Sequence, residues 1–362
     1  MYLESLSALN FRNLRSIDSK LVPGVNIFYG NNGSGKTNLL EAIFVLCLGR
    51  SHRSAAEAVL IHRGSEYYRL EGQVYIDDRS LALAVAYQRG MRKKVTVDKV
   101  QVKLSELYSR FAVVAAGPED SNILSGAPSM RRSFLDVYLS QYSSSYLSQL
   151  MSYQKVLNQK NAALKRRMDA TPFNELLVQS GAAIMQDRLD YLANLGKLAT
   201  GYYQAVSGGG EFELEYRPSV KLPAGLSGYD DIAAVFANTL GEYEEREKVM
   251  EASLVGVHRD DVAFSINGLP ARSHGSQGEW RTAAVALKLA VYHLIRERRS
   301  IRPVLLLDEI FAELDSDRSE ALTAAFEDFE QLFISTAAEL PRFLSAGSRR
   351  YKMVDGAIVE IN

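Results

Sequence analysis

The sequence predicts an α/β fold that is interrupted by a mainly helical segment, and three observations lead to this prediction. Near the N-terminus a short apolar strand, residues 25–29, runs into a glycine-rich loop and then into a helical pattern. The middle of the chain places its apolar residues at helical spacing, and the C-terminal part again alternates apolar strands with helices. We therefore expect one α/β domain built from residues 1–120 and 255–362, with a helical lobe at 121–254.

The composition is that of a folded protein with a sizeable core. The chain has 362 residues, of which 47% are hydrophobic, and this length favours about two domains. Lys and Arg number 42 and Asp and Glu 43, so a surface that is basic throughout is excluded, whereas a local basic face is not. Cys47 is the single cysteine, which excludes an intrachain disulfide and argues against a cysteine-based zinc site.

No segment of the sequence predicts a membrane anchor or a secretion signal. The longest apolar stretch, residues 39–48, is shorter than the roughly 18 residues of a transmembrane helix and contains Glu41. The first 14 residues lack the basic start and apolar run of a signal peptide. We expect a cytoplasmic protein that does not contact membranes.

The N-terminal third is expected to be mostly β-structure. After the strand at 25–29, residues 37–48 have helical spacing. Three β-type runs follow between residues 66 and 102, and the turn residues Asp77 and Asp78 separate the first two, which predicts a small antiparallel meander. Another apolar strand is expected at 111–116.

The middle and the end of the chain differ in pattern. Helical spacing extends over 129–164, 172–206 and 230–251, and a short strand is expected at 211–216. The last part predicts strands at 262–267, 304–307 and 332–335, helices at 278–298 and 316–329, and a final hairpin. This hairpin should turn at Asp355-Gly356, a favoured two-residue turn.

The loop after the first apolar strand matches G-x-x-x-x-G-K-[ST], the phosphate-binding loop. Glycines allow close approach of phosphate oxygens, and successive N–H groups form an anion site at the start of the following helix. Lys36 would reach the β- and γ-phosphates, and Thr37 would ligate Mg²⁺. The alternative is an accidental glycine turn, but the strand before the loop and the helix after it favour nucleotide binding. The candidate nucleotide contacts are Gly30, Asn31, Asn32, Gly33, Ser34, Gly35, Lys36, Thr37 and Asn38.

A second candidate segment is the apolar strand at 304–307, which ends in Asp308 and Glu309. Asp308 would hold Mg²⁺, and Glu309 would polarise the attacking water. An apolar strand followed by two acids is common by itself, so the prediction depends on the phosphate-binding loop. Both segments follow predicted strands at their carboxyl ends, where α/β proteins bind ligands.

These motifs together resemble a known family. Gly275-Ser-Gln-Gly-Glu279, immediately before a helix, resembles the signature loop of ABC-type ATPases, and Ala312-Glu-Leu-Asp315 resembles their D-loop. The whole chain resembles the RecF family, which is related to SMC and Rad50 ATPase heads. The other segments that carry this resemblance are Asn10–Leu14, Gly49–Arg53, Pro118–Asp120, Arg131–Asp136 and His258–Asp261.

The resemblance implies an ABC-type ATPase head in which two protomers enclose two ATP molecules. Lys36, Glu309 and Ser276 would be the catalytic residues, with Ser276 and Gly278 contacting the γ-phosphate held by the other protomer. Arg12 resembles a nucleotide-contacting residue of Rad50-type heads. Two positions depart from the family pattern: Val257 stands where proline is expected, and Glu279 where glutamine is frequent. The alternative for Ser276–Gly278 is a polar turn that caps a helix.

The resemblance further implies a weak DNA-dependent ATPase that uses ATP and Mg²⁺ and acts in recombinational repair and replication. Its partners would be double-stranded DNA and single/double-strand junctions, a second copy of the chain joined by ATP, and RecR and RecO. The candidate DNA contacts are Arg50, Arg53, Lys93, Lys94, Arg131 and Arg132. A basic cluster taken alone is more often a solvated face, so DNA binding follows mainly from the resemblance and not from the charge. The alternative function is the ATPase head of another SMC/Rad50-like or ABC-type protein, although the sequence lacks long heptads.

Overall fold

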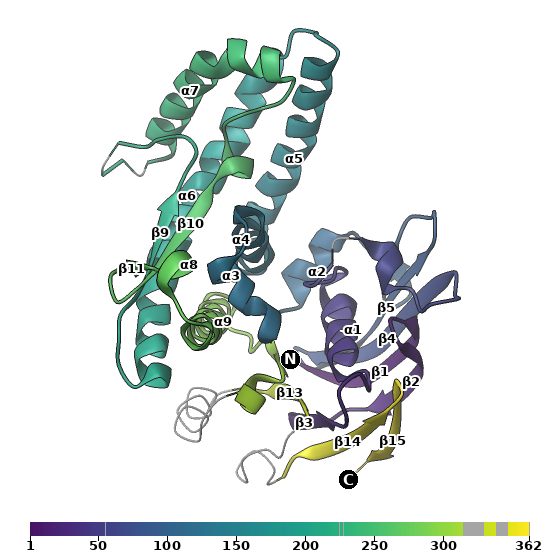
Figure 1. Ribbon diagram of the computed structural model, residues 1–362. Helices are drawn as coiled ribbons and strands as arrows, with labels where there is room; N and C mark the ends of the chain where they lie inside the picture. The colour runs from purple at the N-terminus through teal and green to yellow at the C-terminus, as the bar shows by residue number, and fades with distance from the viewer. Residues whose placement is uncertain (55, 224, 227, 314–328, 338–346, 362) are drawn as a thin grey trace. The chain divides into compact units, whose positions relative to one another are not determined.

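The computed structural model describes residues 1–361 except 55, 224, 227, 314–328 and 338–346 (Figure 1). These residues form two compact units, each built from more than one chain segment. Unit 1 comprises Met1–Asp120, Ala205–Gly208 and Lys288–Asn362, and unit 2 comprises Ser121–Gln204 and Gly209–Leu287. Among the described helices, none combines the length and the apolar character that a membrane crossing requires.

The first sheet of unit 1 is antiparallel throughout, because each strand pairs with neighbours that run the opposite way. In spatial order its strands are β2 (Leu14–Lys20), β1 (Tyr2–Phe11), β4 (Tyr67–Ile76), β5 (Arg79–Gln88), β6 (Lys94–Val97) and β7 (Val100–Gln101). The predicted meander is therefore present as β4 to β6. The sequence patterns did not assign β1 and β2, which extend it on one side.

The second sheet of unit 1 is parallel except at one edge. Its strands, in spatial order, are β15 (Ala357–Ile361), β14 (Arg349–Val354), β3 (Gly24–Tyr29), β13 (Gln331–Thr336), β12 (Val304–Asp308) and β8 (Val113–Ala116). Only β15 runs antiparallel to its neighbour. Because Thr336 pairs with Tyr29 and Ser335 with Asp308, the carboxyl ends of β3, β13 and β12 meet at one edge. This register brings the start of the glycine-rich loop and the acidic strand end to the same place.

Helix α1 (Lys36–Leu48) contacts strands of both sheets of unit 1. All ten residues from Leu39 to Leu48 are buried, which explains why this helix is apolar on every side. Glu41 is buried with them. The helix ends at Gly49, whose φ of 67° is the left-handed conformation typical of a helix C-terminus.

The remaining elements of unit 1 are short. They are η1 (Glu57–Leu60), α2 (Leu104–Arg110), η2 (Pro118–Asp120) and η4 (Ile310–Glu313). The predicted helix at 316–329 lies, apart from its last residue, outside the described residues, as do Leu314 and Asp315 of the segment that resembles a D-loop. The C-terminal hairpin turns at Asp355 (φ 46°) and Gly356 (φ 77°), as predicted.

Unit 2 combines helices with a small antiparallel sheet. The helices are α3 (Ser121–Ser125), α4 (Pro128–Tyr142), α5 (Ser144–Lys165), α6 (Pro172–Ser207), α7 (Tyr229–Met250), η3 (Val257–Arg259), α8 (Ala271–His274) and α9 (Gln277–Arg299). The sheet has the order β11 (Leu269–Pro270), β10 (Asp261–Ile266) and β9 (Phe212–Arg217). The end of α6, from Ala205, and the second half of α9, from Lys288, belong to unit 1.

The helical pattern at 129–164 proves to be two helices, so its prediction as one continuous stretch is wrong. Ser143 lies between α4 and α5 in an extended conformation, and its hydroxyl accepts a hydrogen bond of 3.2 Å from the amide of Tyr146. This is the contact that a serine makes at a helix N-terminus. The helical spacing of apolar residues is nearly continuous across Ser143, so the sequence pattern alone does not reveal that one helix ends and another begins there.

A buried arginine organises the core of unit 2. Arg188 of α6 forms ion pairs of 2.9 Å with Asp136 and with Asp260, and it also donates to the carbonyl of Val257. Burial of a guanidinium is tolerated when its donors are satisfied in this way. Asp260 belongs to the His-Arg-Asp-Asp segment, and in this structure its role is to hold Arg188.

Candidate nucleotide-binding site

The glycine-rich loop joins β3 to α1 in a conformation that requires its glycines. Gly30, Gly33 and Gly35 have φ values of 152°, 82° and 105°, which L-residues with side chains rarely adopt. A Cβ atom at Gly30 would lie 2.3 Å from the carbonyl oxygen of Met353. A Cβ at Gly35 would lie 3.0 Å from Oδ1 of Asn13. The loop is therefore closely packed, in a conformation that glycine adopts without strain and other residues do not.

Two segments that are distant in sequence hold this loop. On one side, Nδ2 of Asn13 donates to the carbonyl of Gly33 at 3.1 Å, and Oδ1 of Asn13 accepts from Asn38 at 2.8 Å. On the other side, the amide of Gly356 in the C-terminal turn donates to the carbonyl of Ser34 at 2.9 Å. These bonds fix the backbone before any ligand binds, which reduces the ordering cost of binding.

The loop also contains the groups that a phosphate needs. Nζ of Lys36 donates to the carbonyls of Gly30 and Asn31 at 2.9 and 3.1 Å, and it lies 3.0 Å from Oε1 of Glu309. The hydroxyl of Ser34 is buried and has no hydrogen-bond partner among the described residues. An orphaned hydroxyl and a folded-back ammonium in a glycine loop fit a nucleotide phosphate.

Asp308 and Thr37 lie together, as the predicted metal site requires. Oδ1 of Asp308 accepts a hydrogen bond of 2.9 Å from the Thr37 hydroxyl and a second one from the Ser335 hydroxyl. Burial raises the pKa of Asp308, while these two hydrogen bonds oppose the rise and the charge of Glu309 adds to it. A cation at this carboxylate would favour its ionised form.

The oxygen donors near Asp308 fit a Mg²⁺ ion that is bound together with phosphate oxygens. They fit less well a metal ion that is coordinated by protein side chains alone. Mg²⁺ prefers oxygen ligands and usually takes only one or two carboxylates together with phosphate oxygens. Across the described residues, no group of three or more His, Cys, Asp and Glu side chains forms a metal site. A single aspartate beside a threonine therefore fits a metal ion that arrives with a nucleotide.

Glu309 follows Asp308 in a left-handed conformation, with φ of 51°. Its amide donates to the carbonyl of Ser335 at 3.1 Å, and its Oε2 accepts from the amide of Ala337, also at 3.1 Å. A non-glycine residue in this conformation costs on the order of 1–3 kcal/mol and is frequent at functional sites. The backbone therefore directs the Glu309 carboxylate to Lys36 at a cost in stability.

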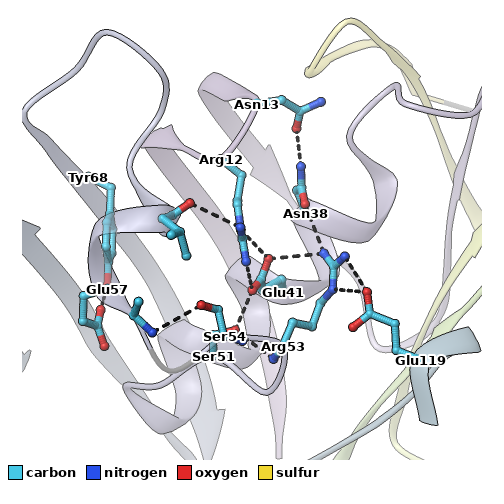
Figure 2. Close-up of polar contacts among 12 residues, drawn as sticks. Arg12, Asn13, Asn38, Glu41, Ser51, Arg53, Ser54, Glu57, Tyr68 and Glu119 are labelled. Atoms are coloured by element: carbon cyan, nitrogen blue, oxygen red, sulfur yellow. Dashed lines mark hydrogen bonds and ion pairs between the residues drawn. The ribbon is translucent and has the colours of Figure 1, made fainter. Parts of the chain in front are cut away.

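A buried carboxylate that was not predicted links two arginines beside the loop (Figure 2). Glu41 of α1 is 0% exposed and receives two hydrogen bonds from Arg12, from Nε at 2.9 Å and from Nη2 at 2.8 Å. Ser51 donates to the same carboxylate at 2.5 Å, and Nη1 of Arg53 lies 3.5 Å away. A charged residue inside an apolar helix is the sequence signal that could have indicated this network.

Arg53 connects this network to Asn38 and Glu119 (Figure 2). Its Nη2 forms an ion pair of 2.9 Å with Glu119, and its Nη1 donates to Oδ1 of Asn38 at 3.3 Å. Arg53 and Glu119 line a small cavity together with Thr37 and Asp308. Glu119 lies in η2, and Lys288 anchors this element through an ion pair of 2.8 Å with Asp120.

The segment that resembles the signature loop lies in unit 2, at the start of α9. Ser276 and Gly278 are exposed. The amide and the hydroxyl of Ser276 both donate to Oε2 of Glu279 at 2.8 Å, and the hydroxyl accepts from the Glu279 amide at 3.3 Å. This is a capping box, so the helix-capping alternative describes the local geometry correctly.

The six candidate DNA contacts differ in how available they are. Lys94 is exposed and Arg50 is half-buried, and neither forms an ion pair among the described residues. Lys93 is paired with Glu57. Arg131 is 3% exposed and donates to both carboxylate oxygens of Asp261 at 2.6 and 3.0 Å. Its burial argues against a contact with DNA.

Two other candidates are also engaged within the protein. Arg132 donates to the carbonyl of Asp260 at 2.8 Å, and Arg53 is bound to Glu119 and Glu41. Spacing in the sequence showed clusters of positive charge, but it could not show that their partners lie elsewhere in the chain.

Comparison with known proteins adds evidence that is independent of this geometry. A model of the RecF/RecN/SMC N terminal domain matches residues 2–354. The chain is 36% identical over 345 residues to the DNA replication and repair protein RecF of Halalkalibacterium halodurans, which covers 93% of this chain and 92% of that protein. The chain belongs to the RecF family.

Other RecF proteins are similar along the entire chain. The RecF protein of Clostridium tetani is 32% identical over 372 residues, covering 99% of this chain and all 100% of that one. A solved structure of the recombination mediator protein RecF with ATP, in the RecFOR pathway, has a TM-score of 0.91 at 31% identity and covers 100% of this chain and 97% of that chain. The predicted family is therefore confirmed.

The fold is shared more widely than the RecF family. The Smc head domain of Pyrococcus furiosus has a TM-score of 0.54 at 15% identity, covering 100% of this chain and 96% of that chain. The predicted fold class, an α/β ABC-type ATPase head with an inserted mainly helical lobe, is confirmed. Fold alone does not assign chemistry, which depends on the site residues described above.

Proposed function

We propose that this chain is an ATP-dependent DNA-binding protein of recombinational repair and replication. The observation that carries this proposal is the geometry of Thr37, Lys36 and Glu309 with Asp308 at one edge of the parallel sheet. Membership of the RecF family supports it, because a solved relative is described as RecF with ATP in the RecFOR pathway. The α/β segments 1–120 and 255–362 are proposed to be the ATPase domain, with 121–254 as the helical lobe. This functional division assigns residues 255–287 to the ATPase domain, although they belong to compact unit 2.

The residues of the loop, Gly30 to Asn38, would surround the ATP phosphates through their amides. Lys36 would leave the loop carbonyls and contact the β- and γ-phosphates. Thr37 and Asp308 would hold Mg²⁺, which neutralises phosphate charge when it is bound. Glu309 would orient and deprotonate the attacking water once Lys36 has turned to the phosphates. Arg12, fixed by Glu41, is proposed to contact the nucleotide.

Two copies of the chain are proposed to enclose ATP between them. Ser276 and Gly278, which are exposed, would contact the γ-phosphate bound by the other protomer. Such an arrangement makes hydrolysis depend on dimerisation, so the isolated chain should be a slow ATPase. Ser276 would be a catalytic residue only within the dimer.

The proposed nucleic acid is double-stranded DNA or a single/double-strand junction, bound without sequence preference and stimulating hydrolysis. Contacts of Lys and Arg with phosphates give affinity that falls with salt. Lys94 and Arg50 are the candidates that have no ion pair among the described residues. RecR and RecO are the proposed protein partners, since the solved relatives belong to the RecFOR pathway.

Two variants test this function. Lys36→Met should abolish ATP binding, whereas Glu309→Gln should bind ATP, hydrolyse it poorly and accumulate as a dimer. Lys352→Met is a matched control, because Lys352 forms an exposed ion pair with Glu360 outside the loop. Light scattering with ATP and Mg²⁺ measures the mass of each variant. A Glu309→Gln protein that binds ATP and stays monomeric at micromolar concentration would contradict the proposed arrangement.

A further inference from the structure

The serine of the signature loop is already bound to a negative charge. Oε2 of Glu279 accepts from both the amide and the hydroxyl of Ser276, each at 2.8 Å. These two hydrogen bonds hold the pKa of Glu279 below its usual range, although partial burial opposes them. The carboxylate therefore remains ionised at neutral pH and stays a strong acceptor.

A phosphate and this carboxylate would compete for the same donor. A serine hydroxyl has one proton, so it cannot donate to Glu279 and to a phosphate oxygen at once. Ser276 is exposed and Glu279 is partly exposed, so the serine that binds this carboxylate is open to a second molecule. A phosphate that replaces Glu279 at the hydroxyl must also tolerate a negative charge nearby.

The neighbouring residues make this contact well defined. The amide of Trp280 donates to the carbonyl of Ser276 at 3.0 Å, and its indole N–H donates to the carbonyl of Ala271 at 2.7 Å. A Cβ atom at Gly275 would lie 2.4 Å from the indole nitrogen, so the chain can pass here only as glycine. The start of α9 is thus fixed, and the Ser276–Glu279 contact must break by side-chain rotation.

We propose that Glu279 is a positioning residue that opposes ATP-driven dimerisation by holding the donors of Ser276 until a γ-phosphate displaces it. This inference rests on the proposed function, in which Ser276 contacts the nucleotide of the other protomer. The carboxylate acts on the reaction only through Ser276 and touches no substrate. The negative charge of Glu279 weakens dimerisation. Because only a strongly charged anion such as the γ-phosphate displaces the carboxylate from Ser276, dimerisation depends on the γ-phosphate.

Replacing Glu279 by glutamine distinguishes the effect of the charge from the effect of helix capping. Glu279→Gln keeps an acceptor that completes a capping box, but it removes the charge. Glu279→Ala removes both. Glu297→Gln is the matched control, because it makes the same change in net charge near the other end of α9, where Glu297 pairs with His293. All three are made in the Glu309→Gln background, in which ATP is retained.

Sedimentation with ATP and Mg²⁺ gives the dimer dissociation constant of each variant. We expect Glu279→Gln to tighten dimerisation about tenfold or more, because it removes the repulsion between this carboxylate and a phosphate that takes its place at Ser276. The gain should shrink in about 1 M salt, where the Debye length is about 3 Å. Glu297→Gln should change neither quantity. Glu279→Ala should dimerise less tightly than Glu279→Gln, because its helix start keeps only the Ser276 half of the capping box.

The dimer dissociation constants show whether the charge of Glu279 opposes dimerisation. If Glu279→Gln dimerises no more tightly than the Glu309→Gln parent, Glu279 is only a helix cap and the inference is wrong. If the Glu309→Gln parent and every variant bind ATP and remain monomeric, the proposed function fails and this inference fails with it. A Glu309→Gln parent that dimerises with ATP, together with a Glu279→Gln variant that dimerises about tenfold more tightly at low salt, supports the inference.

Discussion

Replacing Glu41 by glutamine should destabilise the protein much more than removing an ordinary surface carboxylate. Glu41 is fully buried and accepts from Arg12 and Ser51, with Arg53 close by (Figure 2). Glu41→Gln preserves the shape of the side chain but leaves two guanidinium groups without their shared negative partner. One amide oxygen cannot replace both carboxylate oxygens, and the amide N–H groups would face donors.

The magnitude follows from burial. Removing one partner of a fully buried ion pair costs about 3–5 kcal/mol. The side chains of Arg12 and Arg53 are 22% and 25% exposed, so water can hydrate the guanidinium groups in part and offset some of this cost. We therefore expect Glu41→Gln to lower the free energy of unfolding by about 2–3 kcal/mol. The pair of Arg69 and Glu71 is the matched control, since both side chains are about half exposed and such pairs contribute about 0–1 kcal/mol.

Urea unfolding followed by circular dichroism compares Glu41→Gln with Glu71→Gln through the shift of the midpoint at constant slope. Combining Glu41→Gln with Arg12→Gln should recover part of the loss, because the double variant no longer buries an unpaired guanidinium. The same Glu41 variant should bind ATP more weakly if Arg12 contacts the nucleotide. Equal midpoints for Glu41→Gln and Glu71→Gln would show that burial does not decide the strength of this network.

Two further predictions concern Asp308 and the basic residues. Since burial raises the pKa of Asp308, the folded state keeps this proton to higher pH than the unfolded state does, and stability falls as pH rises through that window. Asp308→Asn should therefore raise the melting temperature without Mg²⁺ at neutral pH, and the gain should vanish as the pH falls below the window. A gain that is the same at every pH would contradict this. Lys94→Gln should lower the slope of log affinity for DNA against log salt by about 0.9, whereas Arg131→Gln should lower stability and leave the slope unchanged, because Arg131 is buried with Asp261. A reduced slope for Arg131→Gln would restore it as a DNA contact.

The nucleotide site could be predicted because its residues are adjacent in sequence to elements whose geometry is fixed. Gly30 follows β3 and Asp308 ends β12, and parallel pairing through β13 must bring such strand ends to one edge. Ser335, which also binds Asp308, occupies the end of β13 and has no motif of its own. Its role becomes visible only in the register of the sheet.

The errors and omissions have a common physical cause, which is that partners of buried charges lie far away in sequence. Arg131 and Asp261 are separated by 130 positions, so a run of positive charge looked solvated although one member is buried. Glu41 and Arg12 are 29 positions apart and belong to a helix and a turn. Local periodicity reports which residues are buried, but it does not report which charges neutralise one another there.

In the described structure, three of the predicted nucleotide and metal contacts are engaged with carboxylates. Lys36 lies beside Glu309, Thr37 donates to Asp308, and Ser276 donates to Glu279. Binding of ATP and Mg²⁺ must therefore replace internal partners, so the net free energy is a difference between two sets of charged contacts rather than the sum of the new ones. The first two exchanges occur within one protomer and bring Mg²⁺ to a carboxylate whose ionised form burial disfavours. The third exchange, at Ser276, brings the γ-phosphate close to the Glu279 carboxylate, and it is the step in which a second protomer would bind. A chain with these three pairs should bind nucleotide before it dimerises, and Glu279 is the residue whose charge separates the two events.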